Sequence, residues 1–285
     1  MGYGDEIMAT GDARVVRETT GRRVAICKGK TVRWHAMFSG NPGLASQAEV
    51  DSDPAVIRIQ NYPGARPYLD YDKITRLGRS KLGKKASFKH EIGAARRWIY
   101  VPGYRVARGE IFLTEQEKAW AAEVRKSLGP FVVFEPRVKA RASPNKQWGA
   151  RRWLDLVDLA EKSAQLVQLV PPGCGALLPS RAAEVVTPTF RHAAAVLSQA
   201  SAAVLPEGGL HHAAAALGVP AVVIFGGCTA ADVLGYSDHV NLSYDHPDSP
   251  CGLRDPCGHC REAMDSIKPG DVARHLKKLL EREDG

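Results

Sequence analysis

The sequence lacks a long uninterrupted hydrophobic run. Its longest apolar stretch, Ala213 to Phe225, is broken by Gly218 and Pro220 and falls short of the roughly 18–20 residues that span a bilayer. The first residues, MGYGDEIMATGD, carry acids where a secretory signal carries basic residues, and no apolar segment follows them. We therefore expect neither a transmembrane helix nor a signal peptide, and we predict a cytoplasmic protein.

Two common nucleotide-binding motifs are absent as well. The chain contains neither G-x-x-x-x-G-K-[ST] nor G-x-G-x-x-G, which excludes a P-loop and a dinucleotide-binding fingerprint. It has no low-complexity tract, and its hydrophobic (44%) and charged (25%) fractions are those of a globular protein. A chain of 285 residues is long for one compact core, because domains cluster near roughly 100–150 residues. We therefore expect two domains.

The excess of basic residues is confined to the first half of the chain. Lys and Arg outnumber Asp and Glu by 23 to 14 in residues 1–129, whereas residues 130–285 hold 16 basic and 17 acidic side chains. A uniformly basic nucleic-acid-binding protein does not need this asymmetry. The asymmetry indicates a first domain that meets an anionic partner or a membrane surface; the alternative is that these are solvated surface side chains.

The second half alternates apolar strands with helical segments. Strands are predicted at 131–134, 166–170, 184–186, 202–205 and 221–225, and helices from 151, at 190–200, at 210–217 and at 271–283. The strands are apolar throughout, which is typical of a parallel sheet that is covered on both faces. The pattern predicts a doubly wound, Rossmann-like α/β unit.

The first half is less regular. We expect a helix at 7–19 and strands at 23–27, 56–60 and 98–101, with another strand ending near Ile111. Thr114 and Glu117 have the spacing of a capping box, which predicts a helix over 115–128. The domain boundary is expected near Gly129-Pro130, which gives domains over 1–129 and 130–285.

A glycine turn joins a buried strand to an alanine-rich helix in LPEGGLHHAAAALGVPAVVIFGG, residues 205–227. In a parallel sheet, the free amides and the helix dipole at such a junction favour anions. Glycines there allow close backbone approach by a ligand, unless they serve only the turn. Basic residues after the strand at 131–134 could reach the same crevice, namely Arg137, Lys139, Arg141 and Lys146. The inferred ligand is a phosphorylated molecule such as a nucleotide derivative.

Cysteines cluster late in the chain. Cys251, Cys257 and Cys260, together with His259, could supply thiolate and imidazole ligands to zinc, with P-C-x-x-C as a knuckle. A structural zinc site typically uses two spaced pairs, however, and only one C-x-x-C is present. We therefore expect no metal cofactor, and the alternatives are free thiols in a loop or one disulfide.

Four segments in order along the chain carry a family resemblance: GYGDEIMAT (2–10), PNKQW (144–148), EGGLHHAAAALGVPAVVIFG (207–226) and CGLRDPCGHC (251–260). They resemble landmarks of glycosyltransferase family 9, the heptosyltransferases of lipopolysaccharide assembly. The resemblance covers both ends and most of the second half, whereas residues 30–105 match poorly.

The resemblance implies a GT-B architecture, in which two Rossmann-like domains with parallel sheets face a central cleft. The first domain would bind the acceptor and the second the nucleotide sugar. The implied reaction is an inverting, metal-independent transfer, for example of heptose from ADP-heptose to lipopolysaccharide or another surface glycan. Such an acceptor implies peripheral contact with the inner membrane. By resemblance, Asp5 is the candidate general base, Lys146 binds phosphate, and Glu207, Gly208, Gly209 and His212 match the segment D-[ST]-G-x-x-H.

The chain departs from the family pattern in several places. Gly208 stands where a Ser or Thr is usual and Glu207 where Asp is usual, so that only backbone contact with the donor remains at Gly208. Family members also place a strand ahead of the G-D loop, so either the chain continues upstream or the first sheet lacks that strand. Asp5 and Glu6 equally suit the first turn of a helix.

The two histidines also have structural explanations. His212 could be a satisfied, half-buried imidazole, and His211 points about a quarter-turn away from it on a helix. The alternative to an enzyme is a non-catalytic protein that binds a sugar nucleotide or a nucleic acid.

Overall fold

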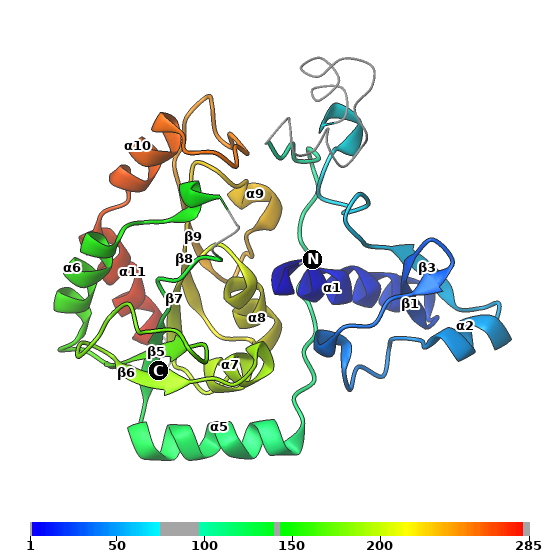
Figure 1. The fold of residues 1–285 in the computed structure, drawn as a ribbon, viewed down its shortest axis with the longest axis horizontal. Coiled ribbons are helices and arrows are strands. Elements are labelled where there is room, and N and C mark those ends of the chain that lie inside the picture. The colour runs from blue at the N-terminus through cyan, green and yellow to red at the C-terminus, as the bar shows by residue number, and fades with distance from the viewer. Residues whose placement is uncertain (1, 75–96, 140–142, 282–285) are drawn as a thin grey trace.

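The computed structural model describes residues 2–74, 97–139 and 143–281 (Figure 1). It contains a six-stranded sheet and a three-stranded sheet, each with helices packed on it. The predicted α/β architecture is therefore confirmed. Among the described residues, no helix combines the length and the apolar character needed to cross a membrane.

The larger sheet is parallel throughout and has the order β6-β5-β4-β7-β8-β9. The strands are β4 (Phe131–Phe134), β5 (Gln165–Val170), β6 (Ala183–Val186), β7 (Ala202–Pro206), β8 (Ala221–Gly226) and β9 (Val240–Ser243). All five predicted strands are present within one residue of their expected bounds, and β9 was not anticipated. The strand order reverses direction between β4 and β7, and such switch points are where ligands bind in open α/β sheets.

Helices cover both faces of this sheet, which explains why its central strands are apolar on both sides. Alternate residues face opposite layers, so that Val132 and Val204 pack with Trp153 and Leu276 in one core, whereas Phe131 and Leu205 belong to the other. The helices are α6 (Ala150–Ala160), α7 (Phe190–Leu197), α8 (Gly209–Leu217), α9 (Ala231–Leu234), α10 (Gly258–Ser266) and α11 (Pro269–Leu280).

The smaller sheet has the order β2-β1-β3, from β1 (Val24–Lys28), β2 (Thr31–Val32) and β3 (Ile57–Gln60). It is mixed rather than wholly parallel, because β2 turns back antiparallel to β1 through a turn in which Gly29 has φ 62°. α1 (Tyr3–Thr20) and α2 (Gln47–Ser52) accompany it. Side chains of β1 alternate between two cores: Val24 and Ile26 pack with α1, and Ala25 and Cys27 with α2.

Two predicted strands of the first half do not form. Among the described residues, 98–101 pair through an isolated bridge between Tyr100 and Leu69, and the backbone of Trp98 bonds Gly252 (N···O 2.8 Å). This segment therefore links the two halves rather than joining a sheet. The stretch around Ile111 is irregular up to the N-cap Thr114, whose predicted capping box with Glu117 is present at the start of α5 (Glu115–Leu128).

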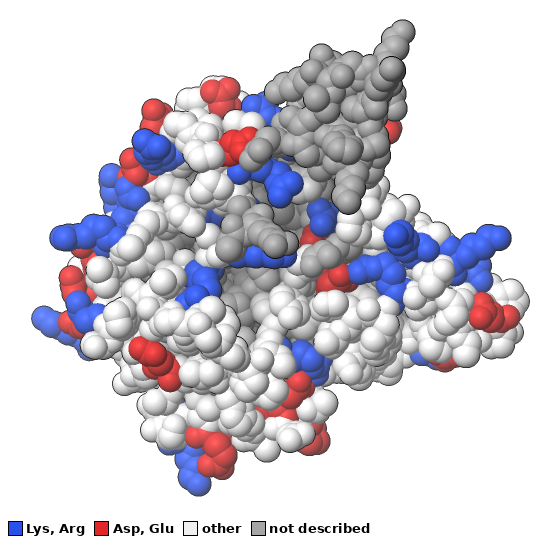
Figure 2. Space-filling view, in the orientation of Figure 1, with Lys and Arg blue, Asp and Glu red and all other residues white. Residues whose placement is uncertain are grey.

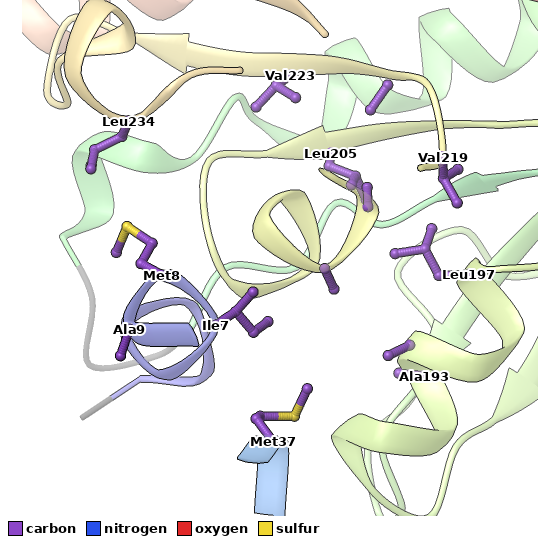
Figure 3. Packing of buried hydrophobic residues seen from close by; sticks show 14 of the residues in the cluster. Ile7, Met8, Ala9, Met37, Ala193, Leu197, Leu205, Val219, Val223 and Leu234 are labelled. Carbon is purple, nitrogen blue, oxygen red and sulfur yellow. The ribbon is translucent and has the colours of Figure 1, made fainter. Parts of the chain in front are cut away.

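α1 lies between the two sheets, beside α8 (Figure 1). Ile7 and Met8 of α1 share one continuous core with Leu205 of β7 and Leu197 of α7 (Figure 3). α5 also packs on α7, where Glu117 forms a buried ion pair with Arg191 (2.6 Å). A division into domains at residue 129 stays a prediction, since core packing is continuous across it.

Candidate active site

The first element of the site is the turn between β7 and α8. Gly208 is the N-cap of α8, and no side chain caps this helix. The amides of its first turn, which in any helix have no intrahelical acceptor, therefore lack a side-chain cap as well. A Cβ added at Gly208 would meet no described atom within 4 Å, whereas one at Gly209 would lie 3.1 Å from Phe190 and 3.4 Å from Tyr3. The turn thus presents open backbone at Gly208 and tight packing at Gly209.

A buried ion pair lies beside this turn. The Lys146 ammonium, at the end of the 3-10 helix η2 (Pro144–Lys146), contacts the Glu207 carboxylate. Thr229 also donates to Glu207, with Oγ1 3.2 Å from Oε2. Burial opposes both charges, but the mutual attraction outweighs it, so the pKa of Lys146 is raised and the pKa of Glu207 is lowered. Both groups are therefore charged at neutral pH.

His212 faces the same carboxylate. Its Nε2 lies 3.9 Å from Oε1 of Glu207, and its Nδ1 shares a 2.9 Å hydrogen bond with the Tyr236 hydroxyl. Burial lowers the pKa of His212 to about 4, although Glu207 opposes the shift. His212 is therefore neutral at pH 7 and is able to donate or accept one hydrogen bond at each ring nitrogen.

His211 is closer to His212 than the helical spacing suggested. The two ring centroids are 4.5 Å apart, and the side-chain ligand atoms of Glu207, His211 and His212 lie within 4.8 Å of one another. Both ring nitrogens of His211 are buried without a partner among the described residues. Burial lowers its pKa well below the ordinary value. His211 thus packs as a neutral ring beneath the site.

Because burial lowers the pKa of His212, we expect the free energy of unfolding to decrease at acid pH. The folded-state pKa of His212 lies below its ordinary value of 6.5, so the unfolded chain binds the extra proton first as the pH falls. The His212 contribution to stability is complete above pH 6.5 and decreases by about 3 kcal/mol by pH 4. Chemical denaturation at several pH values should show a smaller decrease for His212→Asn. The control His246→Asn, at a half-buried position outside this site, should follow the wild type, and equal pH dependence in all three proteins would contradict this assignment.

Asp5 lies in the first turn of α1 rather than in a loop. Its Oδ2 accepts the backbone N–H of Gly2 (2.8 Å), and its Oδ1 accepts the Tyr68 hydroxyl and lies 3.1 Å from Nε of Arg66. Burial and the Asp5 charge raise the pKa of Tyr68 well above its ordinary value, so this hydroxyl stays protonated as a donor. The carboxylate is thereby fixed in orientation, with 13% of its side chain still exposed.

Asp5 and the α8 turn meet because the two helix N-termini are in contact. A Cβ added at Gly4 would lie 2.7 Å from Cδ2 of His212 and 3.5 Å from the Gly209 backbone. The Asp5 charge acts on the pKa of both Lys146 and His212. The fold therefore brings Asp5, Lys146, Glu207 and His212 into one site, although Asp5 is more than 140 residues from the other three.

Other predicted residues lie apart from this cluster or outside the described chain. Arg137 donates to the carbonyl of Gly175 (2.7 Å) and lies beside Glu135 (3.8 Å). Lys139 is exposed, and Arg141 lies outside the described residues. Glu6 is turned away from Asp5, because it pairs with Arg33 (2.6 Å) and is 2% exposed. The cysteine segment forms a separate cluster at α10.

Several residues of the site were not found from the sequence. Arg66 and Tyr68 hold Asp5, Tyr236 holds His212, and Thr229 bonds both Glu207 and the half-buried Tyr100. Arg66 and Tyr68 come from a segment without periodicity, and their only signal is the concentration of tyrosine and arginine between turn-forming Pro and Gly residues. Tyr100 lies in the stretch that was predicted to be a strand.

Comparison with known proteins shows that the fold is similar to that of solved glycosyltransferases. The ADP-heptose lipopolysaccharide heptosyltransferase II of E. coli is 14% identical, with a TM-score of 0.57 over 100% of this chain and 97% of that chain. A glycosyltransferase family 9 protein from Veillonella parvula is 13% identical, with a TM-score of 0.61 over 99% and 95%. The iron-containing dodecameric glycosyltransferase TibC of enterotoxigenic E. coli is 14% identical, with a TM-score of 0.58 over 100% and 75%.

The sequence alone gives no such match. No protein-family model and no curated protein matches it. At identities of 13–14%, the structural likeness concerns the fold. The chain has the two-sheet GT-B-type fold of these glycosyltransferases, as its sequence resemblance implied.

Proposed function

We propose that the protein is an inverting glycosyltransferase that transfers a sugar, with heptose from ADP-heptose as the specific candidate, to an anionic glycan or glycolipid. One observation carries the proposal: a half-buried carboxylate on α1 and a cation beside an uncapped helix N-terminus meet at one site across the two halves. Transfer from a nucleotide sugar needs this combination, because a base must face a site for the departing diphosphate.

Asp5 is the general base of the proposed reaction. The acceptor oxygen forms its bond to the anomeric carbon as the bond from that carbon to the diphosphate oxygen breaks. The acceptor proton passes to the Asp5 carboxylate, and the bonding electron pair leaves with the diphosphate. Tyr68, Arg66 and the Gly2 amide keep the carboxylate oriented for this transfer.

The α8 turn receives the leaving group. The first amides of α8 and the positive end of its dipole stabilise the charge that develops on the diphosphate. Lys146 adds a cation, which Glu207 holds in place before the donor binds. Neutral His212 can donate from Nε2, the nitrogen that faces Glu207. Because Gly208 brings no hydroxyl, the donor contact at this position is with the backbone.

An anionic acceptor would explain the excess of basic residues in the first half of the chain. Figure 2 shows Lys and Arg side chains at its right, over the part of the molecule that holds the smaller sheet. The exposed basic residues of β1 and β3 and of their flanking turns are Arg22, Arg23, Lys28, Lys30 and Arg58. A further seven Lys and Arg against one Glu fall in residues 75–96, which lie outside the described chain. A surface of this kind attracts phosphorylated glycans and the anionic inner face of a membrane.

Thermal denaturation with a panel of ADP-, GDP-, UDP- and dTDP-sugars tests the donor site. A ligand that binds only the folded state raises the melting temperature with its saturation. We expect ADP-heptose to raise it, and Gly208→Val to reduce the apparent affinity at least about tenfold, equivalent to 1.4 kcal/mol. The variant should fold normally, since a Cβ at Gly208 meets open space and its φ of 164° is ordinary extended backbone.

Gly270→Val is the matched control, because Gly270 of α11 also has open space around its Cβ. It should bind the donor like the wild type. Equal donor affinity in the Gly208 variant would remove this turn from the donor site. Donor binding without transfer to any acceptor of a glycan panel would favour a non-catalytic sugar-nucleotide-binding protein.

A further inference from the structure

Three cysteines and a histidine converge where the loop after β9 meets α10. Cys251 and Cys260 are 8% and 1% exposed, and Cys257 and His259 are half-buried. The four ligand atoms, three Sγ and one imidazole nitrogen, lie within 4.8 Å of one another. The proposed transfer does not use any of them.

The cysteines of this cluster are free thiols and do not form a disulfide bond. Sγ of Cys251 and Sγ of Cys260 are 3.0 Å apart, longer than the roughly 2.05 Å of a disulfide bond. All six cysteines are free. Around a tetrahedral ion with bonds of about 2.3 Å to sulfur, ligand atoms are about 3.8 Å apart. The four side chains therefore need only small movements to enclose such an ion.

Neighbouring groups contact three of the four side chains and leave their ligand atoms facing the cluster. The Ser249 hydroxyl lies 2.9 Å from Nε2 of His259, which leaves Nδ1 facing Sγ of Cys260 at 3.8 Å. A ligating imidazole commonly has its other nitrogen bonded in this way. The backbone N–H of Leu253 points to Sγ of Cys251 (3.5 Å). Cys257 is the N-cap of α10, where the helix dipole favours a thiolate.

The turn that brings Cys251 to the others is fixed by its surroundings. Gly252 has φ 63°, and a Cβ there would lie 1.9 Å from the Trp98 carbonyl oxygen. Asn145 holds the following residues: its Nδ2 donates to the carbonyls of Leu253 (2.9 Å) and Asp255 (2.7 Å), and its Oδ1 accepts the N–H of Cys257 (3.1 Å). A cavity of about 460 Å³, lined by Arg97, Asp248 and three of the four side chains, gives an ion access.

We propose that Cys251, Cys257, His259 and Cys260 bind a metal ion of the Zn²⁺ type, which prefers tetrahedral thiolate and imidazole ligands. The ion has a structural role, because all four positions are filled by protein and none is left for a substrate. It fixes the loop held by Asn145, the residue that precedes Lys146. This inference stands independently of the proposed glycosyl transfer.

Elemental analysis of the full-length protein, purified without a metal-affinity step, tests the site. We expect about one zinc or iron ion per chain, with the analysis distinguishing the two metals. After removal of the metal under reducing conditions, added Co²⁺ should give the intense visible bands of a tetrahedral site and the near-ultraviolet bands of thiolate ligation. Cys257→Ser and Cys260→Ser should each lose at least about nine-tenths of the metal.

Cys174→Ser and Cys27→Ser are the controls, since Cys174 is exposed and Cys27 lies in the smaller sheet. Both should retain the metal. Circular dichroism checks that each variant is folded, and the Co²⁺ spectrum of the wild type needs no variant at all. Absence of metal together with absence of Co²⁺ bands would overturn the proposal. So would a Cys251–Cys260 disulfide in the mass spectrum of the freshly isolated protein.

Discussion

Replacement of Asp5 by asparagine is expected to lower the rate of sugar transfer by about 10²–10⁴-fold, the usual contribution of a positioned general base. Asparagine has the size of aspartate and can still accept the Tyr68 hydroxyl, but it cannot take up the acceptor proton. Donor affinity should stay within about threefold of the wild type, since the proposed donor contacts lie on α8 and Lys146. The measurements are transfer rates at saturating donor and donor affinity by calorimetry.

Asp12→Asn provides the matched control for this experiment. Asp12 is on the same helix and likewise accepts a tyrosine hydroxyl, that of Tyr104 (3.1 Å). Burial raises its pKa to about 6, yet it has no contact with Lys146 or His212 among the described residues. Its variant should transfer sugar at close to the wild-type rate. If Asp5→Asn kept full activity, or if it lost donor binding together with transfer, Asp5 would not be the base.

The parts of the fold that the sequence predicted are those with repeated local signals. The central strands β4, β7 and β8 of the larger sheet are buried on both faces, so each appears as an unbroken apolar run, and Thr114 with Glu117 marks the start of α5 directly. The Glu207–Gly209 turn was recognisable for the same reason, because its glycines stand between a strand and a helix. These signals lie within a few residues of one another and do not depend on distant contacts.

The features of the fold and of the site that the sequence did not predict depend on contacts between segments far apart in the chain. Arg66 and Tyr68 reach Asp5 through a segment of turns that has neither helical nor strand periodicity. Residues 98–101 have the composition of a strand, but Trp98 bonds Gly252 in the cysteine loop rather than a neighbouring strand. The cysteine spacing shows only one C-x-x-C, whereas the turn at Gly252 returns Cys251 to Cys260. Sequence spacing alone could not place any of these pairs.

Lys146→Met is expected to destabilise the protein more than any other substitution in the site. It would leave the Glu207 carboxylate, whose side chain is 5% exposed, without its cation, and breaking a buried pair in this way costs about 3–5 kcal/mol of unfolding free energy. The double variant Lys146→Met/Glu207→Gln should recover most of this loss, because no buried charge remains. Lys118→Met removes an exposed lysine paired with Glu115 and should cost no more than about 1 kcal/mol.

The pH dependence of the unfolding free energy shows whether Lys146→Met destabilises the protein through the lost charge or through lost packing. In the wild type, Glu207 has a pKa below its ordinary 4.5 and Lys146 a pKa above its ordinary 10.5, so the stabilisation by the pair is constant between these values. Without Lys146, burial raises the pKa of Glu207 above 4.5, and the carboxyl group then opposes folding increasingly as the pH rises. The stability difference between the wild type and Lys146→Met should therefore widen from pH 4.5 to pH 7. A difference that stayed constant would mean that Lys146 stabilises the site by packing rather than by its charge.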